Sequence, residues 1–410
     1  MGAKRAVLIG INYPGTKAEL RGCVNDAMRM KKSLIQRFGF DDENITLLID
    51  TDPSCTQPTG KNIRAALSKL VASGSPGDFL FVHYSGHGTR IPPESGEQDD
   101  TGYDECIVPT DMNLITDDDI RDFVDKVPDG CLITIVSDSC HSGGLIDEAK
   151  EQIGESTKKQ AKREVKTESP SSGFRSIMTS MVNTALESRE INLGFHRSRH
   201  EEHEQLRDLP EGRAHVKSRS LPLSTLIEIL QQKTGNQNID IGKLRMSLYN
   251  VFGEDSSPKM KKMMNLIMDH FQDGKGKAGI GGLVGSLAQG FLQMSMEQGG
   301  GGGAKPAVKP QPQAQTAHAG SSTRTMPDNG ILISGCQSDQ TSADATPAGN
   351  PSAAYGALSN AIQMLLSESR GPVSNKELVL GVRKMLEKQG FTQRPGLYCS
   401  DDTVNSPFVC

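Results

Sequence analysis

A cysteine and a histidine with the chemistry of a nucleophile and its proton-transfer partner follow two apolar runs of the sequence. The run 78–85 leads into His87, and the run 131–138 leads into Cys140, with glycines near both residues. Glycine lets the backbone turn sharply and approach a substrate closely. A neighbouring imidazole lowers the pKa of a thiol and can later protonate a leaving amine. His87 and Cys140 are therefore predicted to be a catalytic dyad, and the backbone N–H groups of Gly88 and Cys140 are candidates to hold an oxyanion.

The elements around these residues indicate how they come together. Apolar, β-branched runs alternate with stretches of helical spacing, which is typical of parallel strands buried on both faces and joined by helices. The predicted strands are 4–12, 44–50, 78–85 and 131–138, and the predicted helices are 24–38, 60–72 and 116–127. Ligand sites of such sheets form at the carboxyl ends of the strands. Because His87 and Cys140 both follow such ends, a dyad is favoured over a buried structural cysteine and a turn histidine.

The remaining chain divides by composition. Residues 154–325 pass from a charged, Ser-rich stretch through a helical region to a low-complexity segment rich in Gly, Pro and Gln. A strand at 329–336, two helices and a strand at 395–400 follow, but this tail is too small for a core of its own. We predict an α/β sandwich with a mostly parallel central sheet flanked by helices. Residues 1–153 form its large part, 326–410 complete the sheet, and 154–325 are a partly helical, partly disordered insertion.

The overall composition argues against several classes of protein. Lys and Arg number 45 against 50 Asp and Glu, a net charge of −5, whereas nucleic-acid binding needs a basic surplus. No window reaches about 18 uninterrupted apolar residues, so no membrane span is predicted. Eight cysteines without CxxC spacing do not make a disulfide framework and fit a reducing compartment. We therefore expect a cytoplasmic monomer that binds neither nucleic acid nor membrane.

Two motifs carry a family resemblance. HYSGHGT (83–89) and DSCHSGG (138–144) together resemble the metacaspases, the caspase-like cysteine peptidases of plants, fungi and protists, with DSCHSG in place of the caspase form QAC-x-G. The opening residues 4–27, the long insertion and the ending look like a plant type II metacaspase. The resemblance implies a caspase-like fold in which His87 and Cys140 are the dyad and no third triad member is expected.

Acidic residues near the dyad predict a pocket for a basic side chain. Asp138 lies two positions before Cys140, and Asp26 follows the first strand, so both can face the same sheet edge. Carboxylates bind Arg through its guanidinium fork and Lys as a point charge. Taken alone, Asp26 also fits the first turn of a helix. The resemblance implies cleavage after Arg or Lys, with Asp339 or Asp344 completing the pocket.

A second acidic group comprises Asp99, Asp100, Asp117, Asp118 and Asp147. Clustered carboxylates repel one another unless they are separated or bind a metal, and their oxygen atoms select calcium or magnesium. Taken alone, the segment TDDDI is typical of a helix N-cap followed by first-turn acids, which the helix dipole favours. The resemblance implies instead that this group binds an activating calcium ion, with Asp119 as a further, weaker member.

The insertion contains basic residues that such a peptidase would cut. Lys217 and Arg219 come just before an apolar helix, which by itself is an ordinary charged lead-in to that helix. The resemblance implies a zymogen that cuts itself in this region when calcium arrives. We expect Lys217 to occupy the basic-residue pocket until then, with Arg219 as the close alternative.

These patterns together predict a calcium-dependent cysteine endopeptidase that cleaves protein and peptide substrates after Arg or Lys and activates itself by cleavage near Lys217. The family's general role implies stress- and damage-linked proteolysis, including programmed cell death. The alternative from another class is a catalytically silent caspase-like scaffold that binds partners through the insertion. The intact pair of His87 and Cys140 and the acidic pocket count against a silent scaffold.

Overall fold

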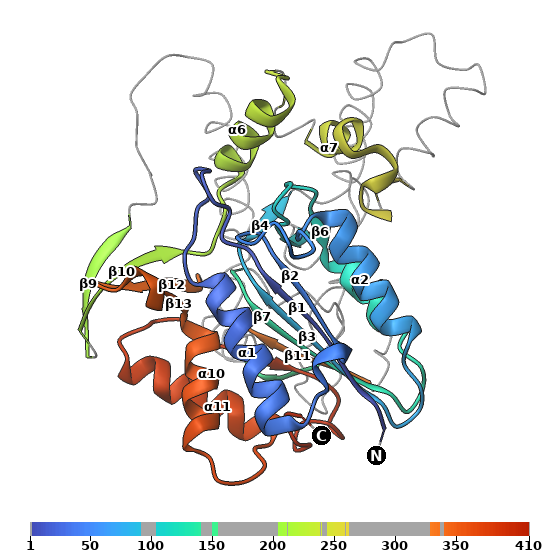
Figure 1. The fold of residues 1–410 in the computed structure, drawn as a ribbon, viewed down its shortest axis with the longest axis vertical. Helices are drawn as coiled ribbons and strands as arrows, with labels where there is room; N and C mark the ends of the chain where they lie inside the picture. Colours follow the sequence, from blue (N-terminus) through green and yellow to red (C-terminus); the bar gives the residue numbers. More distant parts are fainter. Residues whose placement is uncertain are drawn as a thin grey trace, which may run out of the picture.

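A seven-stranded sheet in the order β2-β1-β3-β7-β11-β14-β8 forms the centre of the molecule (Figure 1). The computed structural model describes residues 2–91, 104–140, 150–154, 204–261 apart from 211, 238, 240–243 and 259, 329–336 and 340–409. The four strands predicted in the N-terminal third are β1 (Lys4–Gly10), β2 (Ile45–Ile49), β3 (Phe79–Ser85) and β7 (Leu132–Asp138). They run parallel to one another, as predicted for strands joined by helical crossovers.

The C-terminal part of the chain completes this sheet. Strand β11 (Gly330–Ser334) lies parallel to β7, and β14 (Gly396–Tyr398) lies antiparallel to β11. Strand β8 (Glu151–Ile153) pairs antiparallel with β14 at the sheet edge. The prediction that the tail adds strands to the N-terminal sheet is therefore confirmed.

Alternate residues of the central strands pack into two different cores. On β1, Ala6 and Leu8 face one core, whereas Val7 and Ile9 face the other. The first core is covered by α1 (Cys23–Phe38), α10 (Ala357–Glu368) and α11 (Asn375–Lys388), and the second by α2 (Gly60–Ala72) and α3 (Asp117–Val124). The fold is the mostly parallel α/β sandwich that the sequence predicts (Figure 1).

Local sequence explains where several helices begin and end. The Thr59 hydroxyl accepts a hydrogen bond from Asn62 N–H at the start of α2, and Ser374 and Glu377 form a capping box at the start of α11. Helix α1 ends at Gly39, whose φ of 67° is a left-handed conformation that glycine adopts at little cost. Short 3₁₀ helices are η1 (Asp42–Asn44), η3 (Gly253–Asp255) and η4 (Pro351–Ala353).

Two smaller antiparallel sheets lie beside the central one. One sheet contains β13 (Tyr355–Gly356), β12 (Ala343–Pro347), β10 (Gly212–Ser218) and β9 (Gln205–Leu209), and the other contains β4 (Gly88–Ile91), β5 (Asp104–Ile107) and β6 (Ile115–Thr116). The hairpin of β9 and β10 belongs to the charged stretch for which no strand was predicted. Most of β9 is exposed, so its sequence lacks the apolar alternation of a half-buried strand.

The insertion also contributes two described helices, α6 (Leu223–Thr234) and α7 (Leu244–Phe252). Their buried residues, among them Leu226, Ile229 and Leu248, join the core under α2 and α3. Figure 1 shows both helices at the end of the molecule opposite the two termini. The helical expectation is thus confirmed for 223–234 and 244–252, whereas 262–296, which include most of the second expected helix, lie outside the described residues. Within the described part of the chain, no helix is long and apolar enough to cross a membrane.

Replacement of Ile333 by Ala should show how strongly β11 stabilises the sheet. Ile333 is 1% exposed and lies between β7 and β14, so the lost burial and the cavity should cost about 2–5 kcal/mol. Urea unfolding of Cys140→Ala protein would measure this cost. Leu380→Ala on the exposed face of α11 is the control and should cost less than about 1 kcal/mol, and equal costs would contradict a core position for β11.

Candidate active site

The ends of β3 and β7 bring the predicted dyad to one edge of the sheet. Ser85 and Asp138 are neighbours in the strand register, and His87 and Cys140 each follow two residues later. The two loops touch: a Cβ atom at Gly88 would lie 1.8 Å from the carbonyl oxygen of Cys140. Only glycine fits such an approach, which explains why it follows the histidine.

The imidazole of His87 is held in one tautomer. Its Nε2 atom lies 2.8 Å from the carbonyl oxygen of Ala18, and because a carbonyl can only accept, Nε2 carries the hydrogen. Nδ1 is buried and has no hydrogen-bond partner among the described residues. Burial lowers the pKa of His87 to about 4, so the ring is neutral at neutral pH. Nδ1 is therefore available as a base.

The thiol of Cys140 is buried in the same region. Its Sγ atom accepts a hydrogen bond from Ser342 N–H at 2.9 Å, and the residue has no exposed surface. Burial raises the pKa of Cys140 well above its usual range, and nearby Cys336 adds to this effect. Burial therefore favours the neutral thiol of Cys140 and the neutral imidazole of His87.

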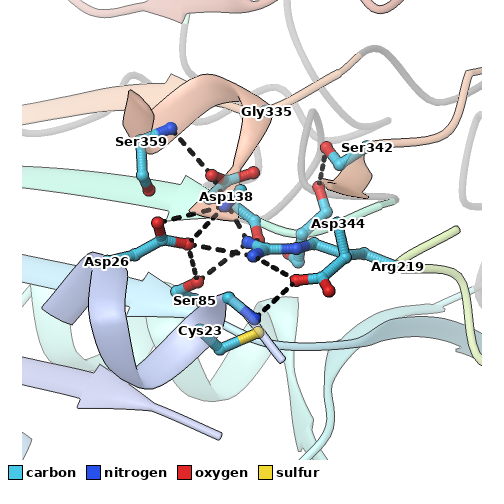
Figure 2. Close-up of polar contacts among 12 residues, drawn as sticks. Cys23, Asp26, Ser85, Asp138, Arg219, Gly335, Ser342, Asp344 and Ser359 are labelled. Atoms are coloured by element: carbon cyan, nitrogen blue, oxygen red, sulfur yellow. Dashed lines mark hydrogen bonds and ion pairs between the residues drawn. The ribbon is translucent and has the colours of Figure 1, made fainter. Parts of the chain in front are cut away.

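Three carboxylates converge beside the dyad (Figure 2). Asp26 lies in the first turn of α1, Asp138 ends β7, and Asp344 lies on β12. Their orientation is fixed by backbone N–H donors: Gly356 to Asp26 at 2.9 Å, Ser359 to Asp138 at 2.8 Å and Gly22 to Asp344 at 3.1 Å. This acidic pocket, defined by Asp26, Asp138 and Asp344, is the predicted site for a basic side chain.

The guanidinium of Arg219 fills the acidic pocket. Its Nη2 lies 2.9 Å from carboxylate oxygens of both Asp26 and Asp344, and its Nη1 lies 3.3 Å from Asp138. Nη1 also donates to Ser85 Oγ at 2.8 Å (Figure 2). Burial, followed by the charge of Asp138, raises the pKa of Asp26 to about 7, although Arg219 opposes this shift. The carboxylates raise the pKa of Arg219 well above its ordinary value despite its burial, so the guanidinium stays charged.

The expectation that Lys217 occupies this pocket is wrong. Its ammonium group is exposed and donates to the carbonyl oxygen of Glu19 at 2.8 Å. Strand β10 ends at Ser218 and the chain bends at the next residue, so Arg219 enters the pocket. Two basic residues two positions apart are equivalent in the sequence, and only the position of this bend distinguishes them.

The segment around Arg219 lies in the site as an extended peptide would. Arg219 N–H donates to the carbonyl of Ser342, and the Arg219 carbonyl accepts from Gly88 N–H, both at 2.9 Å. Leu221 N–H then donates to the Gly88 carbonyl at 2.8 Å. Gly88 N–H, one of the two predicted oxyanion donors, therefore contacts the Arg219 carbonyl oxygen. The other predicted donor, Cys140 N–H, makes no hydrogen bond to the Arg219 carbonyl oxygen within the described residues.

Several residues of the site were not predicted from the sequence. The hydroxyl of Ser85 bridges Arg219 and Asp26, and its place at the end of β3 was an available signal. The backbone roles of Ala18 and Ser342 left no signal, because any residue type has a carbonyl and most have an N–H. Of the two candidates for the third acid, Asp344 lies in the pocket, and Asp339 lies outside the described residues.

A second group of carboxylates gathers at the start of α3. One oxygen each from Asp104, Asp117 and Asp118 lies within 4.8 Å of the others. Burial and the charges of Asp104 and Asp118 raise the pKa of Asp117 well above its usual range. Carboxylate oxygens that converge and repel one another suit a hard divalent cation such as calcium. The predicted ligands Asp99, Asp100 and Asp147 lie outside the described residues. Asp104 was not predicted.

Asp119 takes a different position. It forms a capping box with Thr116 at the start of α3 and lies 3.4 Å from Arg64. Its other oxygen accepts from the Ser257 hydroxyl at 2.9 Å. The TDDDI segment therefore starts a helix, as its sequence indicates, while two of its acids join the carboxylate group.

Removal of the Arg219 charge should destabilise the uncut protein strongly. In a Cys140→Ala background, Arg219→Gln leaves buried carboxylates without their counter-charge, which should cost about 3–5 kcal/mol in urea unfolding. The control Lys217→Gln alters an exposed side chain on the same segment and should cost less than about 1 kcal/mol. A similar loss for both variants would contradict the special role of the Arg219 contacts.

Comparison with known proteins identifies the family. Residues 4–149 match the family described as "Metacaspase, peptidase C14 domain". The chain is 59% identical to Metacaspase-4 of Arabidopsis thaliana over 99% of this chain and the whole of that protein, and 55% identical to Metacaspase-6 over the whole of both. It is 37% identical to Metacaspase-9 of the same plant over 98% of this chain and 96% of that protein. The chain belongs to the metacaspase family of cysteine peptidases.

Proposed function

We propose that this metacaspase cleaves after Arg or Lys, is made as a zymogen, and activates itself in a calcium-dependent way by cutting after Arg219. The position of Arg219 carries the proposal, because its guanidinium fills the acidic pocket while its carbonyl accepts from Gly88 N–H. A scissile residue needs both contacts at once. A silent scaffold would need neither of them.

In the proposed reaction, His87 Nδ1 takes the proton of Cys140, and the thiolate attacks the carbonyl carbon of Arg219. Negative charge develops on the oxygen that Gly88 N–H already contacts. His87 then gives the proton to the departing amine of Ser220, and water later releases the carboxylate of Arg219. In the uncut state, burial disfavours both thiolate and imidazolium, which supports a resting zymogen.

The pocket also supports the proposed preference for basic substrates. The three carboxylate residues of the acidic pocket are each 3% exposed or less. A cation in such buried surroundings interacts with carboxylates more strongly than it would in water. A guanidinium can use two nitrogens there, as Arg219 does. A substrate with an apolar or acidic side chain at this position would leave the carboxylates uncompensated.

In the proposed function, calcium binds at Asp104, Asp117 and Asp118, with the predicted Asp99, Asp100 and Asp147 as further candidates. When bound, calcium would neutralise carboxylates that now repel one another. The cytoplasmic location is proposed from the cysteine composition, and the role in stress-linked proteolysis and programmed cell death is proposed from the family resemblance.

The first fragment formed on calcium addition should begin at Ser220 and read Ser-Leu-Pro-Leu by N-terminal sequencing. Arg219→Gln should slow this first cut about thirtyfold or more, because truncating one partner of a buried charge pair costs about 2–5 kcal/mol. Lys217→Gln is the matched control and should change the rate less than about threefold. A first fragment that begins at Ser218 would instead identify Lys217 as the cut residue.

The double variant Asp117→Asn, Asp118→Asn should need at least about tenfold more calcium for the same rate of self-cleavage, since two of the converging carboxylates lose their charge. The control Asp122→Asn removes a charge from the exposed face of the same helix and should leave the calcium requirement unchanged. Processing of the double variant at wild-type calcium concentrations would show that this group only starts α3.

A further inference from the structure

Two buried tyrosine hydroxyls hold the peptide groups on either side of the catalytic histidine. Tyr13 Oη accepts from His87 N–H at 2.9 Å and donates to the Val108 carbonyl at 2.6 Å. Tyr84 Oη donates to the His87 carbonyl at 2.6 Å and accepts from Val108 N–H at 3.1 Å. Both hydroxyls thus connect His87 to the same residue of the neighbouring chain segment.

The backbone of Tyr13 adopts an unfavourable conformation. Its φ of 49° lies in the left-handed region, which costs a non-glycine residue roughly 1–3 kcal/mol. Asp50, the residue after β2, accepts hydrogen bonds from Tyr13 N–H at 2.7 Å and from Asn12 N–H at 2.9 Å, which fixes the loop. The Tyr13 ring lies 5.0 Å from the imidazole of His87, centroid to centroid. A glycine would relieve the strain but would lose both ring and hydroxyl.

The residue before the histidine fits the same arrangement. A Cβ atom at Gly86 would lie 2.6 Å from Tyr84 Oη and 3.0 Å from Tyr13 Oη. Any larger residue would push the two hydroxyls away from His87. The first glycine of the HYSGHG motif, Gly86, is therefore required by the tyrosine pair.

We propose that Tyr13 and Tyr84 are positioning residues for His87. Their hydroxyls fix its backbone, and the Tyr13 ring together with the Ala18 carbonyl fixes the imidazole, so that Nδ1 stays available to Cys140. Tyr84 follows His83 in the HYSGHG motif, whereas Tyr13 reaches the histidine from a loop 74 residues away in the sequence.

Tyr13→Phe and Tyr84→Phe in the self-processed protein should lower kcat for a basic fluorogenic peptide about tenfold, with KM changed less than twofold. The midpoint of Cys140 alkylation by iodoacetamide against pH should rise toward the range of a free thiol, since a misplaced imidazole no longer supports the thiolate. Tyr13→Leu, which also removes the ring, should have the larger effect. The control Tyr249→Phe, on α7 of the insertion, should change neither quantity.

A purely structural role would lower the midpoint of unfolding without moving kcat or the alkylation profile. That result in both phenylalanine variants would overturn the proposal. A rise in KM at constant kcat would also overturn it, because it would place the tyrosines in substrate binding.

A different observation concerns the insertion and the carboxylate group. Arg245, in the first turn of α7, lies with its Nη2 2.5 Å from Asp104 Oδ2, and both side chains are largely buried. Asp104 is one of the three acids that converge at the start of α3. The insertion therefore places a guanidinium on a carboxylate that calcium would need.

We infer that Arg245 competes with calcium for Asp104, so that calcium binding weakens the docking of α7. This inference rests on the proposed calcium dependence. A calcium ion needs six to eight oxygen ligands at about 2.3–2.6 Å, and its two positive charges repel a guanidinium held at the same carboxylate. Coupling between two binding events is reciprocal, so loss of Arg245 must strengthen calcium binding.

Other contacts hold α7 and the residues after it in place independently of Arg245. Leu244 and Leu248 of α7 are each 1% exposed, and the backbone carbonyl of Asp255 accepts from Asn113 Nδ2 at 2.6 Å. These contacts should keep the helix attached when the charge of Arg245 is removed.

Calcium titration calorimetry of full-length Cys140→Ala protein should therefore give at least about fivefold tighter binding for Arg245→Gln. Arg245→Lys, which keeps the charge, should stay closer to the parent. Arg213→Gln removes an exposed cation of the same insertion and should have no effect. In the parent protein, calcium should speed amide hydrogen exchange in residues 244–252.

Equal calcium affinity in the Arg245→Gln and parent proteins would overturn this inference alone, as would tighter binding by Arg245→Lys to the same degree as by Arg245→Gln. Absence of calcium binding in every variant would overturn both the inference and the proposed calcium dependence.

Discussion

The ion pairs of Arg219 set the geometry of the whole site. A guanidinium without solvent exposure is stable only where carboxylates and hydrogen-bond acceptors surround it. Here those groups come from α1, β3, β7 and β12, and the first and last of these elements lie more than 300 residues apart in the sequence. The pocket can therefore exist only when the C-terminal part is folded onto the N-terminal sheet. Filling of the pocket by the insertion then stabilises the uncut protein.

The same contacts connect the proposed inhibition of the uncut chain with its proposed catalysis. The segment that blocks the site uses the pocket, the backbone of β12 and the Gly88 N–H group, as a bound substrate is expected to do. With this segment in the site, burial keeps both Cys140 and His87 neutral. Exposure of the site to water would lower the free-energy cost of charging both groups. A separate inhibitory domain is not needed for this effect.

The insertion is anchored at two regions of the catalytic part. Its strand β10 pairs with β12 beside the pocket, while α7 and the residues after it contact the carboxylate group and α3. Cutting after Arg219 would separate it from Ser220, but Leu221 and α6 on the other side of the cut keep their own buried contacts. Removal of the segment therefore depends on the second anchor as well, which is where the proposed calcium ion would bind.

The sequence by itself determined the alternating strands and helices, the sheet edge that carries His87 and Cys140, and the acids Asp26 and Asp138. These features follow from local periodicity, from glycines beside reactive residues and from the motifs. The hairpin of β9 and β10, the choice of Arg219 over Lys217, and the contribution of Asp104 depended on tertiary structure. A strand that is exposed along most of its length, such as β9, has no apolar alternation, and the two neighbouring basic residues differ only in where the chain bends. Polar side chains from distant segments form one site only after the backbone has folded, because their contacts depend on position in space and leave no periodic signal in the chain.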